Sequence, residues 1–216
     1  MASLLDNVEK ASAWPHAARA LGDMGELAVP YLPTLASLLG NSSETRDAAA
    51  DTLVRIGAKS VPSLVELLRD PFASTRVTAL RTLGRIGIEA VTHVQAVALL
   101  LADEAPTVRA ATAQTLASLR QEHAVSYAQD LVLLLDEDEP LVRAATIIAL
   151  GGVAKAGAFT HATSLVRCLE DDDASVVKAL LEVLASLGQQ ASRSDRNARL
   201  VSVLSSEVAP FAAATL

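Results

Sequence analysis

The sequence predicts an all-α protein built from stacked two-helix repeats. Three observations lead to this prediction: an aliphatic composition, a motif that recurs every 30 to 34 residues, and apolar positions spaced three and four residues apart. Alanine, leucine and valine supply 41, 34 and 21 of the 216 residues, and only six residues are aromatic. This composition favours helices, and the single cysteine excludes a disulfide scaffold.

The recurring motif marks one amphipathic helix in each repeat. It occupies the segments 45–57, 75–87, 108–120, 142–154 and 176–188. An arginine recurs near its start, at Arg46, Arg76, Arg109 and Arg143, and Val177 takes this place in the fifth segment. Seven residues later comes a common leucine, at Leu53, Leu83, Leu116, Leu150 and Leu184, with further apolar residues three positions before and after it. This spacing places the apolar residues on one helical face and predicts that they are buried.

A second set of apolar segments predicts the other helix of each repeat. These segments are 29–39, 61–68, 91–102, 128–136, 162–171 and 198–206. Four prolines, Pro30, Pro62, Pro106 and Pro140, are expected in first turns, where a missing N–H costs nothing. Four glycines, Gly25, Gly57, Gly87 and Gly188, follow the last apolar residue of a helix and are expected to end it.

The repeats resemble the HEAT family, and in particular the short HEAT-like repeats of phycobilisome-lyase-type proteins. The resemblance rests on the segments LRDPFASTRVTALRTLGRIG (68–87) and LADEAPTVRAATAQTLASLR (101–120). It implies a right-handed α-solenoid, or superhelix, of about six repeats over residues 1–216, with the second helices on the concave face. Residues 1–13 are then expected to form a truncated N-terminal cap and residues 207–216 a C-terminal tail.

The resemblance also implies a ladder in which an aspartate before the second helix of one repeat bonds an arginine of the next repeat. The acidic residues in this position are Asp70, Asp103, Glu137 and Asp171. Each lies six residues before the recurring arginine or, for Asp171, before Val177. We therefore expect a structural role for these arginines.

On each second helix, the residues two positions before and two positions after the common leucine are expected to face the groove on the concave side of the solenoid. Each set of equivalent positions along the repeats is called a column. The candidate partner contacts on and beside these columns are Arg55, Arg81, Arg85, Gln114, Ala144, Ile148 and Gly152. The early positions are charged or polar, whereas the later ones are apolar or small, which favours a partner contact around Ile148. Deeper coverage of that helix by its neighbours is the alternative explanation.

The acidic turns form a second candidate surface. Its residues are Asp136, Glu137, Asp138, Glu139, Asp171, Asp172 and Asp173, which stacking at this period brings to one edge. Two interpretations stay open: solvated turns that cap helices, or a docking edge for a basic partner. A calcium loop fits less well, because its glycine and terminal glutamate are absent.

No motif for catalysis, cofactor binding or metal binding stands out. The four histidines have no partner at metal-ligand spacing, and neither a phosphate loop nor a nucleophile motif is present. Cys168 occupies a column otherwise filled by leucines and is expected to be a buried small hydrophobe. The sequence therefore predicts no catalytic residues, no cofactor and no metal.

These observations favour a non-enzymatic protein–protein interaction or scaffolding module, acting alone or as a subunit of a larger complex. The alternative, implied by the resemblance, is a phycobilin-lyase-like subunit that handles a chromophore or its acceptor protein. The net charge of −7 disfavours nucleic acid, and the longest apolar run, seven residues from Ala96 to Ala102, disfavours membrane insertion. Asp6 and Glu9 near the N-terminus do not fit a targeting signal, so we expect a soluble intracellular protein of the cytoplasm or an organelle interior.

Overall fold

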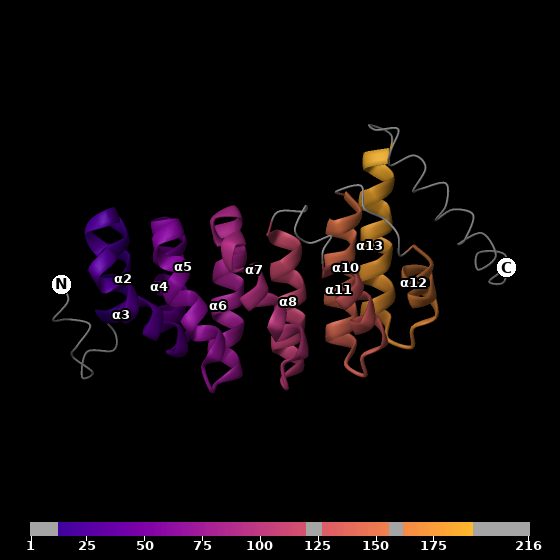
Figure 1. The fold of residues 1–216 in the computed structure, drawn as a ribbon, viewed down its shortest axis with the longest axis horizontal. Helices are drawn as coiled ribbons and strands as arrows, with labels where there is room; N and C mark the ends of the chain where they lie inside the picture. Colours follow the sequence, from indigo (N-terminus) through magenta and orange to yellow (C-terminus); the bar gives the residue numbers. More distant parts are fainter. Residues whose placement is uncertain (1–12, 120–126, 156–161, 192–216) are drawn as a thin grey trace. The chain divides into compact units, whose positions relative to one another are not determined.

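The computed structural model describes residues 13–119, 127–155 and 162–191, and this part of the chain consists of helices and turns without a strand. The predicted all-α arrangement of two-helix repeats is therefore confirmed (Figure 1). The chain divides into two compact units, residues 1–115 and 116–216, and the boundary lies near the end of α8. Three expected segments lie outside the described residues: the cap at 1–13 except for residue 13, the helix at 198–206 and the tail at 207–216.

The two helices of a repeat differ in length and regularity. The longer second helices are α2 (Trp14–Asp23), α4 (Ser43–Ile56), α6 (Ala73–Ile86), α8 (Pro106–Ser118), α11 (Pro140–Lys155) and α13 (Ala174–Ala191). The first helices are α3 (Leu32–Ser37), α5 (Val61–Glu66), α7 (Val94–Ala98), α10 (Ala128–Leu133) and α12 (Ala162–Arg167). Short 3₁₀ segments flank the first helices. The apolar runs 29–39 and 91–102, which the sequence predicted to be helices, are therefore not continuous α-helices.

Glycine ends three of the four helices for which the sequence predicted it. Gly57 and Gly87 follow α4 and α6 with φ angles of 71° and 75°, and Gly25 has a φ of 57°. A residue with a Cβ is strained in this left-handed region, so glycine is suited to stop a helix there. Gly188 instead lies inside α13, where the expectation was wrong. A glycine costs a helix only about 1 kcal/mol, so it does not force an end by itself.

Three of the four prolines also lie where the sequence placed them. Pro106 and Pro140 begin α8 and α11, and Pro62 lies in the first turn of α5. Pro30 instead lies within the 3₁₀ segment Gly25–Tyr31. The fixed φ of proline suits both kinds of helix, so its position alone does not say which kind follows.

In the first unit, the second helices α2, α4 and α6 stand side by side (Figure 1). Leu21, Leu53 and Leu83 are completely buried, as the periodicity predicted. Buried threonines add hydrogen bonds between neighbouring helices. Thr52 Oγ1 of α4 donates to the carbonyl oxygen of Ala18 at 2.8 Å, and Thr115 Oγ1 of α8 lies 2.8 Å from the carbonyl oxygen of Ala111 in its own helix and 3.1 Å from that of Leu80 in α6.

In the second unit, α11 packs against α13. Ile147 and Leu150 of α11 are buried, as is Leu180 of α13. Leu181 occupies the position equivalent to Ile147 but is exposed. Leu184 occupies the position equivalent to Leu150 but is half-buried. The apolar face of α13 is therefore covered less completely than the repeat pattern predicted.

The neighbouring glycines of α11 should respond to alanine with opposite signs. A Cβ on Gly151 would lie 2.7 Å and 2.9 Å from the two methyl carbons of Val183, whereas a Cβ on Gly152 would lie 3.5 Å from the Cβ of Ala117. We expect Gly151→Ala to destabilise the protein by about 1 to 3 kcal/mol through overpacking. Gly152→Ala should stabilise it by about 0.5 to 1 kcal/mol, because alanine is the better helix former. Thermal unfolding of both variants checks this prediction, and equal shifts of the same sign would contradict it.

One stretch of the described residues, Ala73–Ala102, is long and apolar enough to cross a membrane by length and composition alone. In the structure it is not one continuous α-helix. Helix α6 ends at Ile86, and the 3₁₀ segment Gly87–His93 separates it from α7. A single stretch of this kind is a weak indication, and we infer no membrane span from it.

Candidate functional site

The exposed face of the second helices follows the phase that the sequence predicted. Each residue two positions before the common leucine is exposed: Asp51, Arg81, Gln114, Ile148 and Glu182. Two positions after it, Arg55, Arg85 and Ser118 are exposed, while Gly152 and Ser186 are half-buried. Ala144, one turn before Ile148, is half-buried as well. The predicted partner-binding residues thus all have at least partly accessible side chains or backbone.

Two of the predicted arginines already have partners on the preceding repeat. Arg55 Nη2 lies 2.9 Å from Asp23 Oδ1, and Arg85 Nη2 lies 2.7 Å from Asp51 Oδ1. Both pairs are well exposed, so each contributes no more than about 1 kcal/mol. The third, Arg81, makes no ion pair or hydrogen bond among the described residues.

Arg81 and Arg85 line an open hollow of about 520 Å³ between α4 and α6. The opposite wall carries Arg46 and Asp47, and Thr107 of α8 also lines it. The sequence predicts Arg81 and Arg85 as partner contacts and a structural role for Arg46, but the hollow itself is not predicted from it. Everything that lines this hollow belongs to the first unit.

In the second unit, the exposed face of α11 is apolar. Ile148 is 46% exposed, and Leu141, seven residues earlier on the same face, is 51% exposed. With the half-buried Ala144 and Gly152 between and beyond them, these residues form what we call the α11 strip. Leu141 was missed by the sequence analysis, although a spacing of seven residues from Ile148 marks it as a member of the same face.

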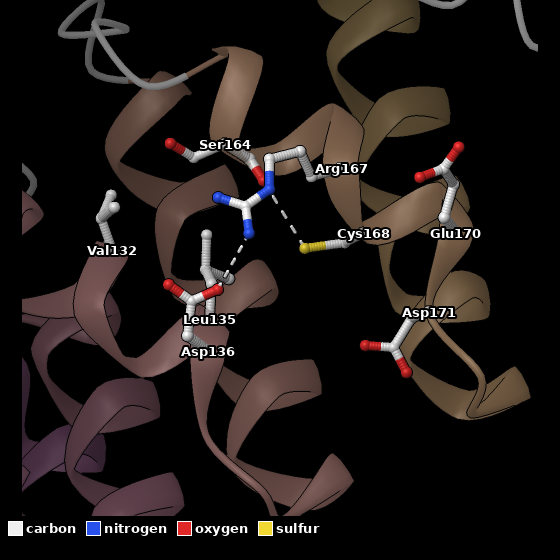
Figure 2. Close-up of a pocket in the computed structure, with 8 residues that line it drawn as sticks. All are labelled: Val132, Leu135, Asp136, Ser164, Arg167, Cys168, Glu170 and Asp171. Carbon is white, nitrogen blue, oxygen red and sulfur yellow. Dashed lines mark hydrogen bonds and ion pairs between the residues drawn. The ribbon is translucent and has the colours of Figure 1, made fainter.

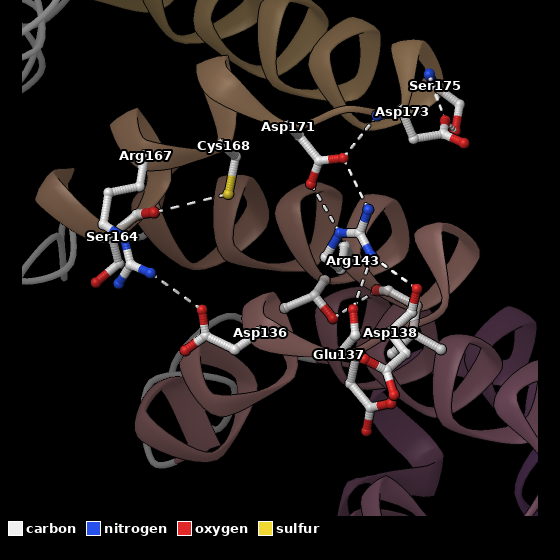
Figure 3. A network of polar contacts seen from close by, with 12 residues as sticks. Asp136, Glu137, Asp138, Arg143, Ser164, Arg167, Cys168, Asp171, Asp173 and Ser175 are labelled. Carbon is white, nitrogen blue, oxygen red and sulfur yellow. Dashed lines mark hydrogen bonds and ion pairs between the residues drawn. The ribbon is translucent and has the colours of Figure 1, made fainter.

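The predicted acidic edge contains well-exposed carboxylates as well as internally bonded ones. Asp136, Asp138, Glu139 and Asp172 are exposed, while Glu137, Asp171 and Asp173 are half-buried. Figure 3 shows Asp171 turned toward Arg143, whose Nε and Nη2 each donate to it at 2.7 Å. These bonds hold the pKa of Asp171 below its usual range. Hydrogen bonds from Ser175 likewise lower the pKa of Asp173.

The aspartate–arginine ladder exists, but it runs in the opposite direction to the one expected. Arg76 Nη2 donates to Asp103 Oδ1 of the following repeat at 2.7 Å, and Arg143 donates to Asp171 of the following repeat. The arginine of one repeat therefore bonds the aspartate of the next. Helical side chains lean toward the N-terminus, which brings the guanidinium to the level of the turn before its own helix.

The ladder also fastens that turn. Nη1 of Arg143 donates to the carbonyl oxygens of Glu137 and Asp138 at 2.7 Å and 2.9 Å. Asp171 Oδ1 additionally accepts the backbone N–H of Asp173 at 2.9 Å (Figure 3). Each arginine–aspartate pair of the ladder thus joins two consecutive turns. Asp171 is therefore already bonded to a side chain of the protein itself.

A smaller hollow of about 290 Å³ lies between α10 and α12 with their 3₁₀ extensions (Figure 2). Arg167 reaches across it to Asp136, with Nη2 3.2 Å from Oδ1. Cys168 is buried, as expected, and its Sγ donates to the carbonyl oxygen of Ser164 at 3.7 Å. Burial raises the pKa of this thiol, which keeps it protonated and poorly nucleophilic. Among the described residues, no group of three or more His, Cys, Asp or Glu side chains could hold a metal ion.

Comparison with known proteins gives a family match and likenesses to solved structures. Residues 61–151 match the family of HEAT repeats. The fold is similar to a chain of the complex of CpcE and CpcF of phycocyanin lyase from Nostoc sp. PCC7120, with 24% identity, 73% of this chain and 98% of that chain covered, and a TM-score of 0.64.

Two engineered proteins have similar folds. The first is 21% identical, with 85% of this chain and 94% of that chain covered and a TM-score of 0.54. The second is 20% identical, with 85% and 96% covered and a TM-score of 0.55. No curated protein matches the sequence. At these identities the likenesses indicate the fold.

Proposed function

We propose that this chain, whose residues 61–151 match the family of HEAT repeats, is a non-enzymatic interaction module that binds a partner protein through the α11 strip. The observation that carries this proposal is the exposure of Ile148 at a position where the other second helices have Asp51, Arg81, Gln114 and Glu182. An apolar side chain that stays 46% exposed on a helix face gains free energy when a partner covers it. The acidic edge is the second surface on which a partner could dock.

The α11 strip is suited to close contact. Ala144 and Gly152 have small side chains or none, so a partner can approach the helix backbone between the larger Leu141 and Ile148. Small residues beside one or two large apolar anchors resemble the centre of protein interfaces, where few residues carry most of the binding energy. A helix held by the packing of α13 also loses little conformational entropy on binding.

Ile148→Asp should abolish partner binding while leaving the fold intact. An exposed position can solvate the new carboxylate in the free protein, but a partner would leave it buried and unpaired at a cost of several kcal/mol. We expect the thermal midpoint to shift by only a few degrees. The measurement is capture of partners from native extract on the immobilised chain, identified by mass spectrometry.

Gln95→Asp is the matched control, because it adds the same charge at an exposed position of the first helix α7. It should retain the partners that the unmodified chain captures. If Ile148→Asp is folded and captures them equally well, the α11 strip is not the contact surface. Charge reversal at Asp138 and Glu139 would then test the acidic edge.

The second candidate is a subunit that handles a bilin chromophore or its acceptor protein. The likeness to a chain of the CpcE and CpcF complex favours it, since 98% of that chain is covered. Adding a free bilin to the protein and recording the visible spectrum tests this function. A spectral change that saturates with protein concentration would support it, and an unchanged spectrum would argue for the interaction module alone.

A further inference from the structure

We propose that the hollow between α4 and α6 binds the carboxylate side chains of an acidic segment in a partner protein. This inference rests on the proposed function only in that the partner is a protein. It concerns a different surface from the α11 strip, with different chemistry.

The lining of the hollow has an excess of positive charge. Arg46, Arg81 and Arg85 face it against a single carboxylate, that of Asp47. Asp47 Oδ1 lies 3.7 Å from Arg46 Nε, and Asp51 pairs with Arg85 at 2.7 Å, so these two carboxylates leave one of the three positive charges, that of Arg81, without a partner among the described residues. At physiological ionic strength, charges more than about 8 Å away are largely screened, so this local excess outweighs the net charge of the chain.

Arg81 has the largest unused binding capacity. Its guanidinium carries five N–H donors, and none of them bonds a group among the described residues. Arg85 spends part of its capacity on Asp51, through Nη2 at 2.7 Å. Arg81 and Arg85 lie four residues apart on α6, so their side chains share one face of that helix.

Arg46 is in the hollow because the ladder is interrupted at this repeat. By the rule that Arg76 and Arg143 follow, Arg46 would bond Asp70 of the next repeat, but the described contacts contain no such bond. Asp70 Oδ1 accepts only the backbone N–H of Phe72, at 2.9 Å. The ladder pairs span 27 and 28 residues, whereas Asp70 follows Arg46 by 24. The shorter repeat leaves this arginine available to a ligand.

Hydroxyl groups complete the donor set. Thr78 and Thr82 donate to carbonyl oxygens of their own helix at 2.8 Å and 2.7 Å, so their donors are occupied. The hydroxyls of Ser74 and Thr107 make no hydrogen bond among the described residues and can donate to an acceptor ligand. The lining groups without a partner among the described residues therefore include the Arg81 guanidinium and the hydroxyls of Ser74 and Thr107, which can all donate to a ligand that accepts hydrogen bonds.

The distribution of these donors favours several carboxylates over one phosphate. Arg81 and Arg85 are one helical turn apart on α6, and Arg46 lies on the facing helix. A phosphate is bound tightly when donors converge on one point, whereas donors spread along a helix match acidic side chains spread along a peptide. The volume of about 520 Å³ also has room for more than one side chain.

The test uses the full chain and a short fluorescein-labelled peptide of alternating glutamate and alanine, with its glutamine counterpart as the neutral probe. Fluorescence anisotropy should show at least about tenfold tighter binding of the glutamate peptide, weakening as salt is added. Arg81→Glu should weaken that binding by about tenfold or more. Arg69→Glu, an equal charge change at an exposed arginine outside the hollow, should leave it within about twofold.

Each outcome decides the proposal. Equal binding of the two peptides, or equal affinity of Arg81→Glu with an unchanged helical spectrum, would overturn it. Binding of inorganic phosphate that Arg81→Glu abolishes, without binding of the glutamate peptide, would replace the acidic segment by a phosphate ligand. Ile148→Asp should bind the glutamate peptide normally, so failure of the α11 strip and failure of the hollow give different results.

Discussion

Arg143→Ala should lower the free energy of unfolding by about 1 to 3 kcal/mol, the cost of leaving the polar groups of a partly buried site without their hydrogen-bond partner. The side chains of Arg143 and Asp171 are only 15% and 10% exposed, and two bonds of 2.7 Å join them. The substitution also removes the bonds to the carbonyl oxygens of Glu137 and Asp138. Asp171 would keep only the backbone N–H of Asp173 as a donor. Urea unfolding followed by circular dichroism measures the loss.

Arg167→Ala is the matched control, since it removes an arginine–aspartate pair of the same unit in which both side chains are about 70% exposed. We expect a change below about 1 kcal/mol, because exposed pairs are solvated in both states. If the two variants lost similar stability, the buried ladder would contribute no more than an exposed surface pair.

The effect of Arg143→Ala should also depend on pH. Hydrogen bonds from Arg143 lower the pKa of folded Asp171, whereas the unfolded chain has the ordinary value of about 3.8. A lowered folded pKa contributes stability above the unfolded pKa and loses it as the pH falls through the folded pKa. The difference between the parent and Arg143→Ala should therefore be constant near neutral pH and shrink below pH 3.8. A difference that grew on acidification would contradict the pairing.

The helical phase could be predicted from sequence because it depends only on neighbours along the chain. Buried Leu53 and exposed Arg55 are two residues apart and lie on opposite sides of one helix, which periodicity alone determines. The same local rule indicated that Ile148 is exposed. Local rules were weaker at helix ends, because whether Gly188 stops a helix depends on the groups that surround it.

The ladder direction and the arginine hollow could not be predicted, because both depend on how far one repeat reaches toward the next. An acidic residue does lie six residues before Arg76, Arg109 and Arg143, but the partner of each arginine is decided by how the repeats stack. Arg46 has the same sequence position as Arg76, yet only Arg76 bonds the following aspartate. Differences in repeat length were visible in the sequence, but their effect on side-chain contacts was not.

Leu116→Ala should lower the free energy of unfolding by about 2 to 5 kcal/mol, the range for removing a large buried aliphatic side chain and leaving a cavity. Leu116 is completely buried in α8 and belongs to the common leucine column. The measurement is the free energy of unfolding and the midpoint in urea, with the slope of the transition checked for equal cooperativity.

Two controls separate burial from helix content. Leu133→Ala makes the same substitution at a position of α10 that is 65% exposed, and Gln114→Ala changes an exposed neighbour on α8 itself. Both should stay within about 0.5 to 1 kcal/mol of the parent, because neither opens a cavity and alanine favours the helix. If Leu116→Ala and Gln114→Ala had similar midpoints, the assigned phase of α8 would be wrong. The exposed columns that define the candidate surfaces would then be wrong as well, because the same phase places Gln114 and Ile148 on the accessible face.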